Sequence, residues 1–304
     1  MPAQSRCLLP PHALLDYPWD DIGIFQVSQL PSGSQVTDRC WKLTGPGGAP
    51  CFVLKERVDS PVARSQATLA HRVTSEGHLG GALWLPHPAP FCTPYQICEG
   101  FLYQGWTWLV GESFSGDCFP QDSAHTLLQQ FHEALETQIG LRNGELPCVF
   151  SRIEVLRGPI NFSTCLAANS LEAKALKVVE ALTPKALKCL GKLPSHGNMV
   201  VCHGDPWTGN WIELGSYPGM LGLIDLTHCR FDHPASDYAR LLGSTLSFRD
   251  NQESDDSMVA ILAWTGHVAA LKRWCLRLLT QEQWLPTEVC RVQWLLLQMG
   301  AYCI

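Results

Sequence analysis

The stretch that decides the fold is Val200-Val201-Cys202-His203-Gly204-Asp205-Pro206-Trp207-Thr208-Gly209-Asn210-Trp211-Ile212. Its first three residues are apolar and predict a short buried strand. The loop that follows contains glycine and proline, and it carries a histidine, an aspartate and an asparagine. Another apolar run begins directly after the asparagine, so the polar side chains are concentrated between two predicted strands.

A hairpin is predicted directly after this loop. Two apolar runs flank a strong turn signal at residues 215–219, and the second run ends at Asp225. With the turn at the centre of the hairpin, Asn210 lies opposite residues 224 and 225. The oxygen-bearing side chains of Asp205, Asn210 and Asp225 would then converge, which predicts a site for a hard cation with a base beside it.

The spacing of these residues resembles the catalytic core of a known family. The pattern H-G-D-x-x-x-x-N at residues 203–210, followed by an aspartate at position 225, is similar to the core of the aminoglycoside phosphotransferase and choline kinase group. These proteins are small-molecule kinases with the protein-kinase-like fold. The segment D-H-P-A-S-D-Y-A-R-L at residues 232–241 looks like the D-P-A-x-D-L-A segment of the same group. The alternative is an ordinary polar loop, which would have to match the order, the spacing and the flanking apolar runs of the family's motif by chance.

The resemblance implies a fold with two lobes. The fold would be α+β and protein-kinase-like, with a small N-terminal lobe built on an antiparallel sheet and a larger, mainly helical C-terminal lobe. We expect the nucleotide-binding lobe to span residues 1–112, with residues 1–20 as an extended arm. The catalytic and substrate lobe would span residues 113–304.

The resemblance also implies a role for each residue of the site. Asp205 would be the catalytic residue that accepts or orients the proton of the acceptor hydroxyl, and His203 would orient the loop. Asn210 and Asp225 would hold Mg²⁺ at the phosphates of ATP. The implied activity is ATP- and magnesium-dependent transfer of the γ-phosphate to a hydroxyl of a small molecule. Members of the group use acceptors as different as aminoglycosides, choline and homoserine, so the resemblance does not name the acceptor.

Three further segments are expected to contact the nucleotide. Lys55 ends an apolar strand and resembles the lysine that holds the α- and β-phosphates. The turn Ser32-Gly33-Ser34 would cover the phosphates, because backbone N–H groups in a glycine-containing turn can bind anions. Val110 and Glu112 lie at the expected hinge, where backbone groups would contact the adenine edge. Each has a plainer alternative. Lys55 could simply extend its charged end into solvent. The turn at residues 32–34 could be only a hairpin turn, and residues 110–112 could be an ordinary loop.

One departure from the family's pattern concerns the partner of Lys55. In the group, the next helix supplies a glutamate, but the helix predicted at residues 61–76 has Gln66 at its centre and Glu76 at its far end. Either Glu76 pairs with Lys55 or no carboxylate of this helix does. We expect Glu76 on the surface and Asp225 as the partner, because an ammonium in a partly buried cleft needs a counter-charge.

Hydrophobic periodicity and turn residues predict the remaining elements. The expected strands are residues 22–30, 39–43, 51–55, 97–102 and 105–110, and residues 80–95 are expected to be irregular. The expected helices are residues 61–76, 122–138, 234–248, 258–279 and 286–304, and residues 170–190 are expected to form one helix or a helix pair. His132 is expected to be a hydrogen-bonded structural residue, and Asp237 is expected to bond the backbone of the catalytic loop.

Composition argues against several functions. A formal net charge of −6 gives no electrostatic footprint for nucleic acid, and no apolar run approaches the length of a membrane span. The first residues lack the long apolar segment of a secretion signal, and the 14 cysteines are scattered. We therefore expect a cytoplasmic protein with reduced thiols and a small hydroxylated substrate, with a few surface disulfides left open.

Two other functions stay open. A nucleotide-binding pseudokinase or sensing module is favoured by Gln66 and by Pro206, since the proline biases Asp205 away from the helical region. The retained aspartates and asparagine argue against it. A metal-dependent phosphoesterase using His203 and Asp205 as ligands would need further histidines nearby, and the sequence has no such cluster.

Overall fold

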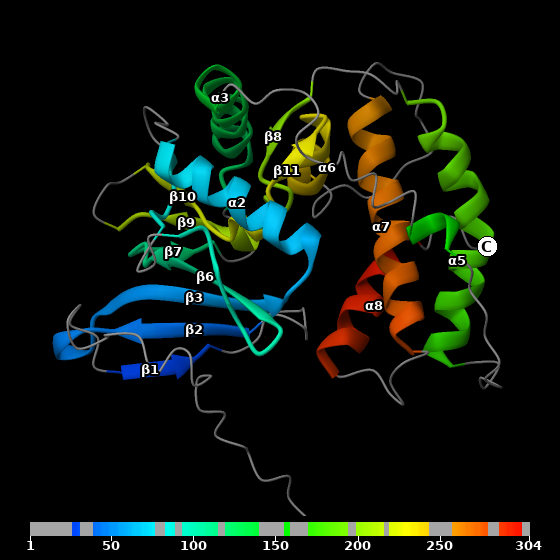
Figure 1. Cartoon of the computed structure of the whole chain (residues 1–304). Coiled ribbons are helices and arrows are strands. Elements are labelled where there is room, and N and C mark those ends of the chain that lie inside the picture. Colours follow the sequence, from blue (N-terminus) through cyan, green and yellow to red (C-terminus); the bar gives the residue numbers. More distant parts are fainter. Residues whose placement is uncertain are drawn as a thin grey trace, which may run out of the picture.

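The computed structural model describes residues 26–30, 39–76, 83–88, 93–114, 119–139, 155–158, 170–193, 199–215, 219–242, 257–278 and 286–299. The arm expected at residues 1–20, the start of the strand expected at residues 22–30 and the turn Ser32-Gly33-Ser34 lie outside this part of the chain. The described elements form an α+β structure, with the largest sheet at one end and the helices α5, α7 and α8 at the other (Figure 1).

A five-stranded antiparallel sheet forms the N-terminal part, in the order β1-β2-β3-β6-β5. Its strands are β1 (Gln26–Gln29), β2 (Arg39–Thr44), β3 (Pro50–Val58), β5 (Gln96–Cys98) and β6 (Phe101–Thr107). Because side chains alternate along a strand, one face buries Trp41, Leu43, Leu54 and Tyr103 in a small core. The central strand β3 carries Lys55 on the opposite face and is hydrogen-bonded on both sides.

The strand boundaries predicted at residues 97–102 and 105–110 are wrong. The chain turns at Glu99 and Gly100, which have φ of 49° and 80°, and this two-residue turn joins β5 to β6. Two residues with positive φ match the right-handed twist of a hairpin. Gly105, which the sequence suggests as the start of a new strand, lies inside β6 opposite Leu54.

The helix α2 (Pro61–Glu76) connects the N-terminal sheet to the rest of the molecule. Its first turn is stabilised by Ser60, whose Oγ accepts a hydrogen bond from the Ala63 N–H at 3.1 Å. Ala63 and Ala67 pack against Leu102 of β6. The next turns of α2 belong to a different core shared with α3 (Gln121–Ile139), to which they contribute Leu69, Ala70 and Val73.

Two small sheets carry the residues of the expected site. The first has the order β4-β10-β9-β7, and its strands are β4 (Leu83–Trp84), β10 (Leu221–Leu223), β9 (Trp211–Glu213) and β7 (Glu112–Ser113). The second pairs β8 (Val200–Cys202) with β11 (Arg230–Asp232). The irregular passage predicted at residues 80–95 is wrong at β4, which pairs in parallel with β10. A two-residue strand is too short to leave a periodic sequence pattern.

The C-terminal part is mainly helical. Its helices are α5 (Leu171–Leu190), α6 (Ala235–Leu242), α7 (Ser257–Leu278) and α8 (Pro286–Met299), which share one core. Ser170 caps α5, because its Oγ accepts a hydrogen bond from the Ala173 N–H at 3.1 Å. No helix in the described segments is both long and apolar enough to cross a membrane. All eight described cysteines are free thiols, as expected for that part of the chain.

Candidate active site

The hairpin predicted after the loop at residues 203–210 is confirmed, together with its register. Trp211 of β9 lies opposite Leu223 of β10. The next pair along the hairpin is Asn210 and Ile224, and the Ile224 N–H donates to the Asn210 carbonyl oxygen at 2.9 Å. Asp225 therefore leaves the open end of the hairpin beside Asn210.

Asp225 and Lys55 form an ion pair between the hairpin and the N-terminal sheet. Lys55 Nζ lies 2.8 Å from both carboxylate oxygens of Asp225 and 3.1 Å from Thr227 Oγ1. Burial opposes ionisation of Asp225, but the charge of Lys55 and the hydrogen bonds from Lys55 and Thr227 hold the carboxyl pKa well below its ordinary value. The expected pairing of Lys55 with Asp225 is present.

Asp225 has a left-handed backbone conformation, with φ of 64° and ψ of 55°. This conformation is unfavourable for residues with a side chain, by about 1–2 kcal/mol, although aspartate tolerates it better than most. β10 ends at Leu223, and the short 3-10 turn η4 (Leu226–His228) begins directly after Asp225. The left-handed residue turns the chain at this point, and Leu226 is fully buried on the far side of the turn.

The helix residue that stands in place of the family's glutamate contacts a different cation. Gln66 Oε1 accepts a hydrogen bond from Arg57 at 3.1 Å, and the other terminal nitrogen of Arg57 donates to the Thr227 carbonyl at 2.7 Å. Arg57 and Lys55 are two residues apart on β3 and leave the same face of the strand. Arg57 therefore joins α2 to η4. The side chain of Glu76 lies outside the described residues.

Asp237 holds the start of the loop at residues 203–210 from the buried side. Its Oδ2 accepts the His203 N–H at 2.7 Å, and its Oδ1 accepts the Gly204 N–H at 2.8 Å. His132 Nε2 lies 3.0 Å from the same Oδ2. Burial opposes ionisation of Asp237, but the hydrogen bond and charge of His132 hold the carboxyl pKa below its ordinary value. The structural roles predicted for His132 and Asp237 are confirmed.

His203 is a fixed, neutral part of the loop. Its Nε2 lies 2.9 Å from the Ile224 carbonyl oxygen, and its Nδ1 accepts the Asp205 N–H at 3.3 Å. Because a carbonyl oxygen can only accept, Nε2 carries the proton and Nδ1 carries none. Burial lowers the pKa of His203, which favours the same neutral ring. With both ring nitrogens bonded to the backbone, this side chain fixes the loop and is not placed to transfer a proton to or from a substrate.

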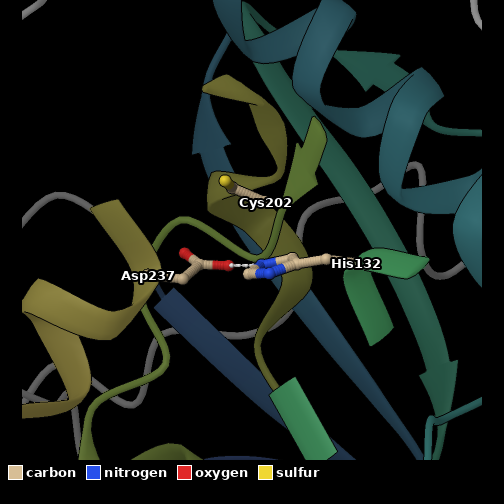
Figure 2. A group of neighbouring side chains, drawn as sticks. All are labelled: His132, Cys202 and Asp237. Atoms are coloured by element: carbon tan, nitrogen blue, oxygen red, sulfur yellow. Dashed lines mark hydrogen bonds and ion pairs between the residues drawn. The ribbon is translucent and has the colours of Figure 1, made fainter. Parts of the chain in front are cut away.

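One described group outside the loop at residues 203–210 has side chains of the kinds that can bind a metal ion. The ligand atoms of His132, Cys202 and Asp237 lie within 4.8 Å of one another, and the dashed line in Figure 2 joins the aspartate to the histidine. However, Cys202 Sγ lies 3.6 Å from the carbonyl oxygens of Asp232 and His233, to which it can donate. Burial raises the pKa of Cys202, so the thiol keeps the proton that a metal ligand must lose. We interpret the group as structural.

Asp205 is held from two directions. Its carbonyl oxygen accepts a hydrogen bond from Asn210 Nδ2 at 2.8 Å, and its Oδ1 forms an ion pair with Arg240 Nε of α6. Because Asn210 donates through Nδ2, its Oδ1 is the amide atom that remains for a cation. Asn210 Oδ1 and the Asp225 carboxylate are hard oxygen donors of the kind that Mg²⁺ prefers. These residues fit the magnesium site that the sequence predicts.

Sequence reasoning missed His228, which lies close to both aspartates. Burial lowers the pKa of this histidine to about 4, while the charges of Asp225 and Asp205 act in the opposite direction.

The backbone carbonyl oxygen of His228 explains why the motif has glycine at position 204. Gly204 has φ of 87°, and a Cβ at this position would lie 2.0 Å from that oxygen. Only glycine fits the conformation and the space.

The segment at the expected hinge runs from β6 to β7. Val110 is 68% exposed, and Glu112 begins β7 by pairing with Glu213 of β9. Gly111 passes so close to β9 that a Cβ would lie 2.3 Å from the Glu213 carbonyl oxygen. Adenine contacts of Val110 and Glu112 stay a prediction, as does the lobe boundary near residue 112. The phosphate-covering turn Ser32-Gly33-Ser34 lies outside the described residues.

Comparison with known proteins agrees with this geometry. The sequence profile of the "Phosphotransferase enzyme family" matches residues 28–274. A search of curated protein sequences found no match. Among solved structures, an amicoumacin kinase in complex with AMP-PNP and Ca²⁺ has a TM-score of 0.61 at 11% identity, over 96% of this chain and 94% of that one.

Two further solved structures are similar over nearly the whole chain. An aminoglycoside phosphotransferase from Alicyclobacillus acidocaldarius has a TM-score of 0.57 at 18% identity, over 98% of this chain and 95% of that one. A spectinomycin phosphotransferase in complex with ADP has a TM-score of 0.54 at 14% identity, over 90% of this chain and 94% of that one.

These similarities show that the chain has the protein-kinase-like fold. Within that class, the chain belongs to the phosphotransferase enzyme family, whose profile covers most of its length.

Proposed function

We propose that the protein transfers the γ-phosphoryl group of ATP to a hydroxyl group of a small molecule, in a magnesium-dependent reaction. The observation that carries the proposal is the ion pair of Lys55 with Asp225 at the end of a loop that also holds Asp205 and Asn210. Phosphoryl transfer needs mainly positioning and charge neutralisation. These four side chains provide a lysine for the phosphates, oxygen atoms for a cation and a carboxylate for the acceptor.

The metal-binding and nucleotide-binding roles divide between the two partners of the ion pair. Mg²⁺, bound by Asp225 and by Asn210 Oδ1, would neutralise negative charge on the phosphates. An ammonium group has three donors, so Lys55 can contact the α- and β-phosphates once a cation neutralises Asp225. Arg57 bonds both Gln66 of α2 and the Thr227 carbonyl of η4, so it holds η4 against α2. Because η4 begins directly after Asp225, this contact also helps to fix the position of Asp225.

Asp205 would receive the proton of the acceptor. The hydroxyl oxygen of the acceptor attacks the γ-phosphorus, the bond from that phosphorus to the oxygen shared with the β-phosphate breaks, and ADP leaves. The hydroxyl proton passes to the Asp205 carboxylate. Arg240 donates to Oδ1 of that carboxylate, so Oδ2 is the atom assigned to the proton. Neutral His203 fixes the loop through its bonds to the backbone.

A nucleotide-binding protein without transfer is the second candidate. Gln66 supports it, because this residue cannot neutralise a lysine and its Oε1 accepts from Arg57. The retained Asp205, Asn210 and Asp225 support transfer instead, since a protein that only binds nucleotide has no use for a base.

Two substitutions test the proposal. Asp225→Ala should abolish magnesium-dependent binding of ATP, whereas Asp205→Asn should leave that binding unchanged and lower the rate of transfer by about 10²–10⁴-fold. ATP binding is measured by calorimetry with and without Mg²⁺, and transfer is measured as ADP release over a panel of hydroxylated small molecules. Asp59→Asn is the matched control, because Asp59 is paired with Arg64 at the start of α2, away from the catalytic loop.

Each outcome assigns the protein to one function. ATP binding without acceptor-dependent ADP release in the unchanged protein would identify the nucleotide-binding candidate. An equal loss of ATP affinity in Asp205→Asn and Asp225→Ala would contradict the division of roles. Phosphoester hydrolysis in the absence of ATP would point to a phosphoesterase.

A further inference from the structure

The largest side chain of the loop at residues 203–210 is also its most exposed one. Trp207 is 36% exposed, and every other residue of this loop is buried or half-buried. Its indole makes no hydrogen bond or ring contact with any other residue that the structure describes. Single exposed apolar side chains are common on protein surfaces, so the way in which this ring is held decides whether it has a role.

The indole lies flat on the backbone of Gly209. A Cβ at Gly209 would lie 2.3, 2.4 and 2.9 Å from Cη2, Cζ2 and Cζ3 of the Trp207 ring. Such similar distances to three consecutive ring atoms place this Cβ over the face of the ring, because a Cβ beside the ring edge would lie much farther from the third atom. Gly209 does not have a positive φ, so its backbone conformation does not require glycine. Glycine is needed because the indole occupies the space of a side chain.

The contacts of the loop decide which of its sides is open. Trp211 is fully buried, and its Nε1 donates to the Pro206 carbonyl oxygen at 3.1 Å. Asp237 is fully buried as well and bonds the start of the loop. One face of the Trp207 ring is covered by Gly209, so the exposure of the ring lies on its other face and its edges. The loop therefore has a packed side and an open side, and the indole is on the open one.

The residue assigned as the base belongs to the same short turn. Asp205 and Trp207 are two residues apart, so their Cα atoms are at most about 7 Å from each other. Asn210 closes the turn, because its Nδ2 donates to the Asp205 carbonyl oxygen at 2.8 Å and its N–H donates to the Trp207 carbonyl oxygen at 2.9 Å. Trp211 and Asp237 occupy the packed side, so an acceptor reaches Asp205 from the open side and passes the indole.

We propose that the acceptor carries a flat ring beside the hydroxyl that is phosphorylated, and that this ring stacks on the open face of Trp207. The inference rests on the proposed function, because it takes Asp205 as the residue that faces the acceptor hydroxyl. An indole face attracts a flat ring through close dispersion contact and through the charge distribution of its π-system. A rigid ring also loses less conformational freedom on binding than an open chain does. Aromatic rings and the C–H faces of cyclic polyols share this chemistry.

The test uses pairs of alcohols that are matched in composition and differ in shape. myo-Inositol and mannitol are a cyclic and an open-chain hexol, and benzyl alcohol and heptanol are an aromatic and an open-chain alcohol of equal carbon number. Choline and its neutral analogue dimethylbutanol form a third pair, which tests whether the indole binds a cation instead. Dissociation constants are measured by ligand-observed NMR with Mg²⁺ and saturating AMP-PNP.

A site-specific readout comes from labelling the protein with 5-fluorotryptophan. The chain has 11 tryptophans, and the fluorine resonance of Trp207 is identified by its loss in Trp207→Phe. Trp294 is the matched control, because it is also 36% exposed but contacts the ring of His267 at 5.5 Å between centroids. It belongs to α8, which packs in the C-terminal core and lies apart from β9 and β10 (Figure 1).

We expect the cyclic member of a pair to bind more tightly than its open-chain partner and to shift the fluorine resonance of Trp207 but not that of Trp294. Trp207→Leu should weaken its binding by about 5–100-fold, because leucine keeps an apolar surface but loses the flat face. Trp207→Phe should retain most of the affinity, and Trp294→Phe should change nothing. Binding of AMP-PNP should be the same in all of these variants.

Binding of AMP-PNP is measured first, because its failure would contradict the proposed function and not the ring preference alone. While AMP-PNP binds, the inference is wrong if open-chain alcohols bind as tightly as cyclic ones, or if no cyclic alcohol binds. It is equally wrong if a cyclic alcohol binds without shifting the Trp207 resonance, or binds Trp207→Leu as tightly as the unchanged protein. Choline that binds more tightly than every cyclic alcohol would assign the indole to a cation. If a ring does bind, the comparison of myo-inositol with benzyl alcohol identifies its kind.

Discussion

The ion pair between Lys55 and Asp225 predicts a strong energetic coupling in the nucleotide-free protein. The perturbation is a double-mutant cycle made of Lys55→Met, Asp225→Asn and the combination of the two. Each single change leaves the remaining charge without its partner, whereas the double change removes both charges. We therefore expect the double variant to be more stable than the sum of the two single losses implies.

The size of the coupling follows from the contacts and the burial. Lys55 Nζ bonds both carboxylate oxygens of Asp225 at 2.8 Å, and the exposed fractions of the two side chains are 10% and 27%. Removal of one partner from a buried pair lowers stability by about 3–5 kcal/mol. Solvent screens part of the charge of Asp225, so we expect a coupling of about 2–3 kcal/mol.

The assay is urea unfolding of the four proteins at pH 7 in the presence of EDTA. The same cycle on Arg64 and Asp59, an ion pair at the surface, is the control and should show a much smaller coupling. Mg²⁺ should restore part of the stability that Lys55→Met loses, because a bound cation can replace the ammonium beside Asp225. A coupling below about 0.5 kcal/mol would mean that the two residues act independently and would refute the reasoning.

Three further predictions concern the surroundings of the loop. Asp237→Ala should lower the free energy of unfolding by about 3–5 kcal/mol in urea titrations, because it leaves buried N–H groups of the loop without an acceptor. If His132, Cys202 and Asp237 bound a metal ion instead, Cys202→Ala would lower the free energy of unfolding by a similar amount. Gly204→Ala should lower the same free energy by at least about 2 kcal/mol, since its left-handed backbone and its contact with a carbonyl both exclude a Cβ. The pKa of His228 lies at about 4, below its ordinary value of 6.5. The unfolded chain therefore takes up a proton first as the pH falls, so this histidine contributes stability above pH 6.5 that is lost towards pH 4. The loss is about 3 kcal/mol at 1.36 kcal/mol per pKa unit. His228→Asn should reduce the difference in unfolding free energy between pH 7 and pH 4.5, and an unchanged difference would argue against this assignment.

Local sequence signals were sufficient for the centre of the site. The turn at residues 215–219 marks the middle of the hairpin, and equal numbers of residues on its two sides then place Asn210 opposite Ile224. The same reasoning failed at Glu99 and Gly100, although these two residues interrupt the apolar run, because glutamate rarely adopts a positive φ and so does not signal a hairpin turn. A turn with one unfavourable residue depends on the strands on both sides, which a local pattern does not show.

Contacts between distant segments were the part that the sequence could not predict directly. Arg57 and Arg240 reach Gln66 and Asp205 only because the fold brings those segments together. Weak signals existed for both arginines. Arg57 lies two residues after Lys55 and leaves the same face of the strand, and Arg240 lies three residues after Asp237 on one helix face. Neither spacing identifies the partner, because that depends on how the helices pack.

The left-handed conformation of Asp225 bears on how a chain of this design could lose its activity. A change of Asp225 alone to glycine or asparagine relaxes the backbone but leaves Lys55 without a counter-charge. A change of Lys55 alone leaves the Asp225 carboxylate without its cation. Both changes together remove the ion pair and the strained residue at once. An evolutionary path to an inactive nucleotide-binding relative would therefore pass through a less stable intermediate. Selection for folding alone would protect both positions for a time, even in cells that had stopped using the reaction.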